Sequence, residues 1–314
     1  MTTGVVIART GGTFRVHVDG RELPAALSGK LKHANEDRVV VGDVVDLTLA
    51  PDGEGPATIT GMHERRSALV RRAGVGGSGA RRAQPIAANV DQVVVVAAVR
   101  DPEAVPRQLD RLLVIAEANE LPPVVVVNKI ELDRAAGATL AQRYAPAGYQ
   151  VLLTSAKTGE GLPALRDLLR GRESVLTGAS GVGKSSLLNA IEPGLKLRVG
   201  AISEKWRTGK HTTTAAELVP LALGGYMVDT PGLREVGTWN LDPDALGFCF
   251  PEFWPYLDQC RFDNCRHLAE PGCAVRAAGQ AGRFDADRLV SYERIYEEVS
   301  VPAWVSGKSR GEER

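Results

Sequence analysis

The sequence predicts a multi-domain chain with a small N-terminal β-barrel, a central α/β domain and a mainly helical C-terminal domain. Three observations support this prediction: short runs broken by turns before residue 69, valine-rich runs between amphipathic stretches at 88–240, and few strand signals from 241 onward. With 314 residues and 44% hydrophobic composition, the chain is long enough to bury the cores of two or three domains.

The first domain is expected over residues 1–68, where short strands follow one another closely. Residues 13–18 alternate between apolar and polar side chains, and Asp19-Gly20 and Gly42-Asp43 are turn signals. So many short strands in so few residues favour a small barrel such as an OB-fold. The strands are expected at 4–8, 13–18, 39–41, 44–47 and 57–60.

Residues 69–87 are predicted to form a flexible linker rich in arginine and glycine. The stretch 74–79 consists mostly of glycine, and arginine pairs flank it at 71–72 and 81–82. Two interpretations stay open: a solvated linker with incidental charge, or a segment whose arginines contact RNA phosphates.

The central domain, expected over 88–240, alternates buried strands with helices. Near-continuous apolar strands between amphipathic helices are typical of a parallel sheet that is covered on both faces. Strands are expected at 92–98, 124–127, 151–154 and 173–176, and helices at 107–119, 162–169 and from 184 onward.

A glycine-rich loop between a predicted strand and a predicted helix is the sharpest motif. Residues 178–185 fit the P-loop pattern G-x-x-x-x-G-K-[ST] in full and follow an apolar strand. Glycines let backbone N–H groups turn toward phosphates, Lys184 reaches the β- and γ-phosphates, and the Ser185 hydroxyl is a ligand for Mg²⁺. The predicted phosphate-binding residues are Gly178, Ala179, Ser180, Gly181, Val182, Gly183, Lys184, Ser185 and Ser186.

Two further loops at strand ends predict recognition of a guanine base. Residues 128–131 are similar to the Asn-Lys-x-Asp motif of GTPases, whose acidic side chain accepts hydrogen bonds from groups that adenine lacks. Here the acid is Glu131, one methylene longer than the usual aspartate. Residues 154–157, Thr-Ser-Ala-Lys, are similar to the loop that supports the base. The predicted base-binding residues are Asn128, Lys129, Ile130, Glu131, Ser155, Ala156 and Lys157.

Two segments after the P-loop complete the predicted nucleotide site. Residues 229–232 match an Asp-x-x-Gly element, in which Asp229 holds Mg²⁺ through water and the Gly232 N–H meets the γ-phosphate. Residues 209–214 are polar and resemble a switch loop in which one threonine completes the Mg²⁺ shell. The spacing does not choose among Thr212, Thr213 and Thr214.

The position after Gly232 predicts slow intrinsic hydrolysis. Leu233 stands where Ras-type enzymes place the glutamine that orients the attacking water, and a leucine cannot do this. A partner or another residue must then complete the site. His211 is the first catalytic candidate beside Lys184, because imidazole can orient or deprotonate water; contact with RNA or solvent is the alternative role.

A cluster of cysteine and histidine predicts a structural zinc site in the C-terminal domain, 241–314. Three thiolates and one imidazole at C-x₄-C-x-H-x₅-C spacing suit tetrahedral Zn²⁺, and a closed set of four ligands indicates structure rather than catalysis. The remaining cysteine, Cys249, is expected to be a small buried residue. The predicted ligands are Cys260, Cys265, His267 and Cys273. Nearby arginines that could meet RNA phosphates are Arg261, Arg266, Arg276, Arg283 and Arg288.

The order of the nucleotide motifs is circularly permuted. Ordinary GTPases present the P-loop first, whereas here the loops at 128 and 154 precede it. With the cysteine cluster, these motifs make the chain resemble the ribosome small-subunit-dependent GTPase A family over nearly its whole length. The resemblance implies an OB-fold, GTP/GDP and Mg²⁺ binding, contact with 16S rRNA, and GTP hydrolysis stimulated by the small (30S) ribosomal subunit during its late maturation. Clustered cysteines at metal-ligand spacing and the lack of a visible secretory signal favour a cytoplasmic protein, and nothing in the sequence demands more than a monomer.

Two other functions stay open at this point. One is an rRNA- or DNA-binding assembly module with little nucleotide turnover, and the other is an ATP-dependent P-loop kinase, which leaves the 128 and 154 loops unexplained. The formal net charge is zero, so nucleic-acid contact must come from local patches. The longest apolar runs are too short to span a bilayer, and no membrane partner is expected.

Overall fold

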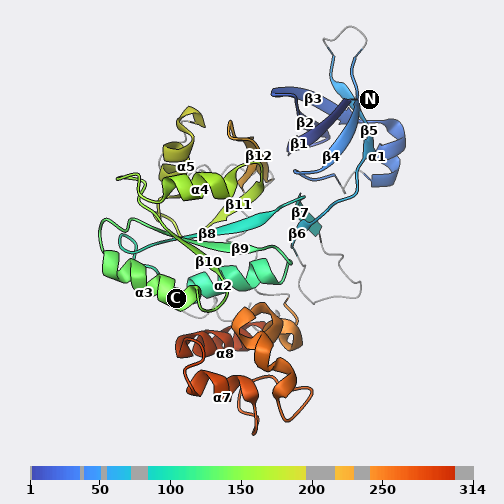
Figure 1. Ribbon diagram of the computed structural model, residues 1–314. Helices are drawn as coiled ribbons and strands as arrows, with labels where there is room; N and C mark the ends of the chain where they lie inside the picture. The colour runs from blue at the N-terminus through green and yellow to red at the C-terminus, as the bar shows by residue number, and fades with distance from the viewer. Residues whose placement is uncertain are drawn as a thin grey trace, which may run out of the picture.

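The structure is a computed structural model that describes residues 2–35, 39–50, 55–71, 84–195, 216–229 and 241–300. Within these ranges the chain forms a closed β-barrel, an α/β unit and a helical C-terminal unit, which run from blue to red in Figure 1. The multi-domain fold class expected from the sequence is confirmed.

The barrel closes because β1 pairs with both β2 and β4, while β3 and β5 lie side by side. In β2, Phe14, Val16 and Val18 are buried in the barrel core, whereas Thr13 and Arg15 are exposed on the other face. This alternation explains why the predicted barrel forms. Its strands are β1 (Thr2–Thr10), β2 (Thr13–Val18), β3 (Arg21–Leu27), β4 (Val44–Thr48) and β5 (Ala57–Met62).

The barrel differs from the predicted elements in two places. The structure contains strand β3 and the helix α1 (Gly29–Asn35), which were not predicted because neither segment shows a clear periodic pattern of apolar residues. Conversely, the strand expected at 39–41 does not form. The Val40 N–H donates to Asp43 Oδ2 at 2.8 Å and the Asp43 N–H donates back to the Val40 carbonyl, so the backbone turns there.

The two ends of the predicted linker form a small antiparallel sheet from β6 (Ala68–Arg71) and β7 (Gln84–Ala88). Leu69 and Ala87 are fully buried in the core of the α/β unit, and this burial fixes both ends instead of leaving them flexible. Residues 72–83, with the glycine stretch and the second arginine pair, lie outside the described residues.

The α/β unit contains, within the described residues, a six-stranded sheet in the order β10-β9-β8-β11-β13-β12. Its neighbouring strands are parallel except for the β12–β13 pair. The carboxyl ends of the parallel strands therefore meet at one edge, where α/β proteins bind ligands. The strands are β8 (Gln92–Ala98), β9 (Pro123–Asn128), β10 (Gln150–Leu153), β11 (Glu173–Thr177), β12 (Glu217–Pro220) and β13 (Tyr226–Asp229).

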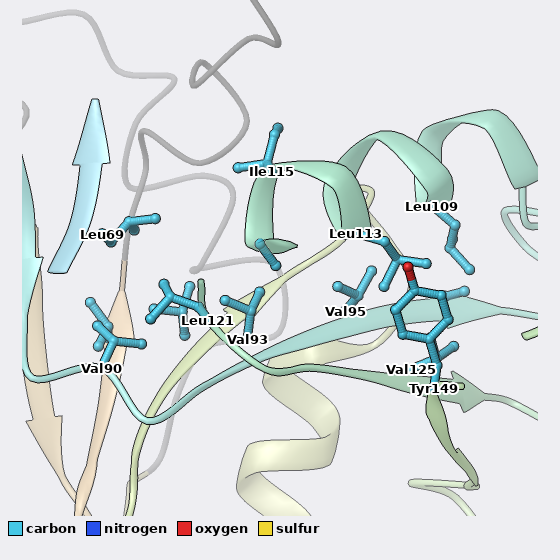
Figure 2. Close-up of a cluster of buried hydrophobic side chains, with 14 of the residues drawn as sticks. Leu69, Val90, Val93, Val95, Leu109, Leu113, Ile115, Leu121, Val125 and Tyr149 are labelled. Carbon is cyan, nitrogen blue, oxygen red and sulfur yellow. The ribbon is translucent and has the colours of Figure 1, made fainter. Parts of the chain in front are cut away.

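Helices cover both faces of this sheet. The odd-numbered valines of β8 pack with residues of α2 and α3, in the cluster that Figure 2 shows, and the even-numbered valines pack with residues of α4 and α5. This two-sided burial explains the near-continuous valine runs. The helices are α2 (Pro106–Glu117), α3 (Arg134–Tyr144), α4 (Leu162–Leu169) and α5 (Lys184–Ile191).

The C-terminal unit packs against α2 through the 3-10 helix η4 and the α-helix α8 (Figure 1). In its core Phe250 stacks on Phe253, Tyr292 packs edge-on against both rings, and Cys249 is buried as expected. Its elements are η4 (Pro243–Cys249), η5 (Pro251–Gln259), α7 (Ala274–Gln280) and α8 (Ala286–Ser300). Among the helices of the described ranges, none combines the length and apolar character that a membrane span requires.

Candidate functional site

The glycine-rich loop connects β11 to α5 at the ligand-binding edge of the sheet. Gly178 and Gly183 have positive φ angles of 139° and 96°. A Cβ atom at Gly178 would collide with the Val96 carbonyl oxygen, and one at Gly183 would collide with the side-chain amide of Asn128. Only glycine fits both positions, and the resulting cradle of backbone groups suits a phosphate chain.

Lys184 lies at the start of α5 and bends back over the loop. Its Nζ donates to the carbonyl oxygens of Gly178 at 2.9 Å and Ala179 at 2.7 Å. Ser185, in the same helical turn, is buried next to it. The ammonium group and the helix N-terminus therefore place positive charge beside the loop, where a nucleotide phosphate chain needs it.

Asn128 joins three of the predicted loops. Its Nδ2 donates to the Val182 carbonyl oxygen in the glycine-rich loop at 2.9 Å. Its Oδ1 accepts from the backbone N–H of Ala156 at 3.2 Å and from the Thr154 hydroxyl at 3.4 Å. Asn128 is fully buried, so these bonds hold the phosphate loop and the two base loops in one fixed arrangement.

The other residues of the base loops divide into buried supports and exposed side chains. Lys129 has a positive φ of 62°, and its Nζ donates to the Asp101 carbonyl oxygen. Ile130 and Ser155 are buried, and the Ser155 Oγ accepts from the Thr158 N–H at 3.0 Å. Glu131 and Lys157 are exposed, so both remain accessible to a base at this edge.

The remaining predicted nucleotide contacts are only partly described. Strand β13 ends at Asp229 beside β11, which brings its backbone to the same edge as the glycine-rich loop. Nothing is described for the Asp229 side chain. His211, Thr212, Thr213, Thr214, Gly232 and Leu233 lie outside the described residues.

Cys260, Cys265, His267 and Cys273 converge as the sequence predicts. Their ligand atoms all lie within 4.8 Å of one another. Tetrahedral Zn²⁺ with sulfur bonds of about 2.3 Å separates two thiolates by about 3.8 Å, and the Cys260 and Cys273 sulfurs lie 3.9 Å apart. His267 Nδ1 lies 3.4 Å from the Cys273 sulfur. Burial lowers the pKa of His267, which favours the neutral imidazole that metal ions bind.

A buried ionic network connects α8 to α2. Arg288 has no exposed surface; its Nη1 donates to Asp110 Oδ1 at 2.6 Å and its Nε donates to Glu252 Oε1 at 2.5 Å. The Phe250 ring centroid lies 4.6 Å from the guanidinium carbon. Burial, reinforced by Glu252 and opposed by Arg288, raises the pKa of Glu117 to about 7.

This network corrects one expectation. Arg288 was grouped with arginines that could meet rRNA phosphates, and that role is wrong because the side chain is fully buried. A signal for burial does exist in the sequence. Ser291, Tyr292 and Ile295 lie three, four and seven positions after Arg288, so a helix places all four residues on one face, and all four are buried.

Comparisons with known proteins agree with this geometry. The sequence model of the family described as RsgA GTPase matches residues 62–239. The chain is 48% identical over 305 residues to the small ribosomal subunit biogenesis GTPase RsgA of Gemmatimonas aurantiaca, covering 95% of this chain and 97% of that protein. The chain belongs to the RsgA GTPase family. The protein of the same name from Moorella thermoacetica is 39% identical over 94% of this chain and 97% of its own length.

Two solved structures resemble the fold of this chain over nearly its whole length. YjeQ from Thermotoga maritima superposes with a TM-score of 0.78 at 35% identity, covering 95% of this chain and 98% of that one. YloQ, described as a circularly permuted GTPase, superposes with a TM-score of 0.74 at 28% identity, covering 95% of each chain. The permuted GTPase fold expected from the motif order is therefore confirmed, and the chain is a GTP-hydrolysing enzyme of this family.

Proposed function

We propose that the chain hydrolyses GTP to drive a late step in the maturation of the small ribosomal subunit. The observation that supports this most directly is the position of Asn128, which ties the glycine-rich loop to both base loops. One guanine nucleotide can then contact all three loops at once. The names of the RsgA relatives support the assignment to small-subunit biogenesis.

In this proposal the loop residues bind opposite ends of GTP or GDP. The amides of residues 178–186 and the Lys184 ammonium hold the phosphates, while Glu131 and residues 155–157 face the base. Bound Mg²⁺ would neutralise developing phosphate charge; Ser185 and one threonine of 212–214 would be its direct ligands, and Asp229 would hold it through water. The fit of the glycine cradle and the placement of Lys184 support this assignment.

Hydrolysis in this proposal depends on a partner. Leu233 cannot orient water, and His211 is the residue assigned to do so once the small subunit has ordered the site. Catalysis then comes from positioning and charge stabilisation by Lys184 and the loop amides. A His211→Ala protein with unchanged subunit-stimulated turnover would end this assignment.

The other parts of the chain are assigned to subunit contact. The proposed division is a barrel at 1–68, a connecting segment at 69–87, a GTPase domain at 88–240 and a zinc-binding domain at 241–314. The four clustered ligands would hold one structural Zn²⁺, and exposed arginines such as Arg261, Arg266 and Arg283 would meet 16S rRNA. We assign the chain to the cytoplasm as a monomer.

Phosphate release from GTP and from ATP, with and without purified small subunits, tests this function. Turnover of GTP that rises with added subunits is the expected result. No turnover of either nucleotide would favour an rRNA-binding assembly module, and a preference for ATP would favour a P-loop kinase.

A further inference from the structure

Within the described ranges, the barrel touches the GTPase unit at a joint beside β7 and at the β12–β13 hairpin. The first is a buried joint, where Asn89 Nδ2 donates to the Gly42 carbonyl oxygen at 2.7 Å and the Ala88 N–H donates to the Val41 carbonyl oxygen at 2.8 Å. Asn89 is 3% exposed. Buried backbone bonds of this kind are costly to break, so the joint fixes one point of the barrel.

The second contact lies between the barrel and the β12–β13 hairpin, where β1 lies beside β12, Ile7 and Leu218 belong to one buried core, and β2 adds polar pairs. Strand β2 of the barrel presents Arg15 and His17 on its outer face to the β12–β13 hairpin. His17 Nδ1 lies 2.7 Å from the Tyr226 hydroxyl, with the two rings edge to face, and Arg15 pairs with Glu217. The Arg15 and Glu217 side chains are 46% and 39% exposed. An exposed ion pair such as Arg15–Glu217 adds little stability by itself, so its loss should leave the fold intact.

The hairpin touched by the barrel contains a residue assigned to the nucleotide site. In the antiparallel pairing of β12 with β13, Glu217 lies opposite Asp229, and Pro220 lies opposite Tyr226. Tyr226 thus begins the strand that Asp229 ends. The stretch with Thr212, Thr213 and Thr214 shortly precedes Glu217 in the sequence. A displacement of Glu217 or Tyr226 therefore moves the strand that ends at Asp229.

We propose that Arg15 and His17 are positioning residues, which hold the β12–β13 hairpin against the barrel and thereby couple the barrel to the bound nucleotide. This inference rests on the proposed GTPase function. Its physical basis is linkage: if GTP and GDP place the hairpin differently, one nucleotide favours the barrel contact, and the contact then favours that nucleotide by the same factor. The buried joint at Asn89 holds the barrel to the GTPase unit independently of the hairpin contact.

Matched variants of the full chain test the inference. Arg15 also pairs with Glu22 inside the barrel at 3.0 Å, so Glu22→Gln and Glu217→Gln each remove one carboxylate from the same arginine. Tyr226→Phe removes only the hydroxyl that meets His17. The measurement is the ratio of the affinities for GDP and for a non-hydrolysable GTP analogue, read by fluorescence titration.

The expected result is a change of about threefold or more in this ratio for Glu217→Gln and Tyr226→Phe, with the Glu22→Gln ratio unchanged. A purely structural role would lower both affinities equally and leave the ratio alone. Unchanged ratios in both hairpin variants, or an equal change in Glu22→Gln, would overturn the inference while leaving the proposed function intact. A wild-type chain that binds neither nucleotide would overturn both.

Discussion

The Asn128 side chain donates to the Val182 carbonyl oxygen at 2.9 Å, so a residue of the base-binding motif supports the phosphate loop directly. The two residues lie on either side of β8, whose carboxyl end separates β9 from β11. This bond couples the two halves of the nucleotide site.

Asn128→Ala should lower GDP affinity at least about tenfold, because it leaves the Val182 carbonyl and the Ala156 N–H without their partner. Titration with a fluorescent GDP measures this. Asn119→Ala is the control, since Asn119 also bridges backbone groups: it accepts from the Val70 N–H of β6 and donates to the Ile115 carbonyl of α2. It lies in the loop between α2 and β9, at the sheet edge opposite the nucleotide loops. Equal affinity losses in both variants would show a general effect of destabilisation.

Gly183→Ala should abolish nucleotide binding at micromolar concentration, because the added methyl group collides with the Asn128 amide. Gly171→Ala is the matched control. Gly171 also has a positive φ, 68°, but a Cβ there meets no described atom within 4 Å. Alanine is strained at a positive φ in both variants, so they differ mainly in the collision of the new methyl group with Asn128. A Gly183→Ala protein that binds GDP normally would contradict the geometry of the loop.

The zinc assignment predicts about one Zn²⁺ per chain by atomic emission spectrometry, and a metal-free Cys265→Ser protein with a lower unfolding temperature. Cys249→Ser serves as the control, because Cys249 is buried in the same unit but is not a member of the ligand cluster. Full zinc content in Cys265→Ser would remove that residue from the ligand set.

Arg288→Met should destabilise the protein by about 3–5 kcal/mol, because Asp110 and Glu252 lose their buried cationic partner. Chemical denaturation measures the free energy of unfolding. Arg294→Met, an exposed arginine on the same helix, should change it by less than about 0.5 kcal/mol. Similar effects of the two substitutions would show that the network contributes little.

Glu173→Gln should make stability less sensitive to pH. Burial and the Asp91 carboxylate, opposed by Arg66, raise the pKa of Glu173 from 4.5 to about 8. The folded chain therefore keeps a proton that the unfolded chain releases, and stability falls as pH rises from 4.5 to 8, by up to about 1.4 kcal/mol per unit. The free energy of unfolding should decrease between pH 6 and pH 8.5 by more in the wild type than in the variant. If the free energy of unfolding changed with pH equally in the two proteins, Glu173 would not be the source of the pH dependence.

Local patterns predicted the motifs well, because each loop is specified by neighbouring residues. The valine run of β8 and the glycines of the 178–183 loop reveal their structure over a few positions. The bond from Asn128 to Val182 could not be predicted, since it depends on the strand order of the folded sheet. The contact between the β12–β13 hairpin and the barrel could not be predicted either. Strand β12 has only four residues, without alternating apolar and polar side chains, and its partners in the barrel are distant in the sequence.

Asp110 and Arg288 are 178 positions apart in the chain, and this separation has a consequence for biosynthesis. At the usual 5–20 residues per second, Arg288 is synthesised on the order of 10 s or more after Asp110. During that interval the Asp110 carboxylate of the nascent chain has no Arg288 guanidinium to pair with. The helix that carries Arg288 thus completes this buried network only long after α2 has been synthesised.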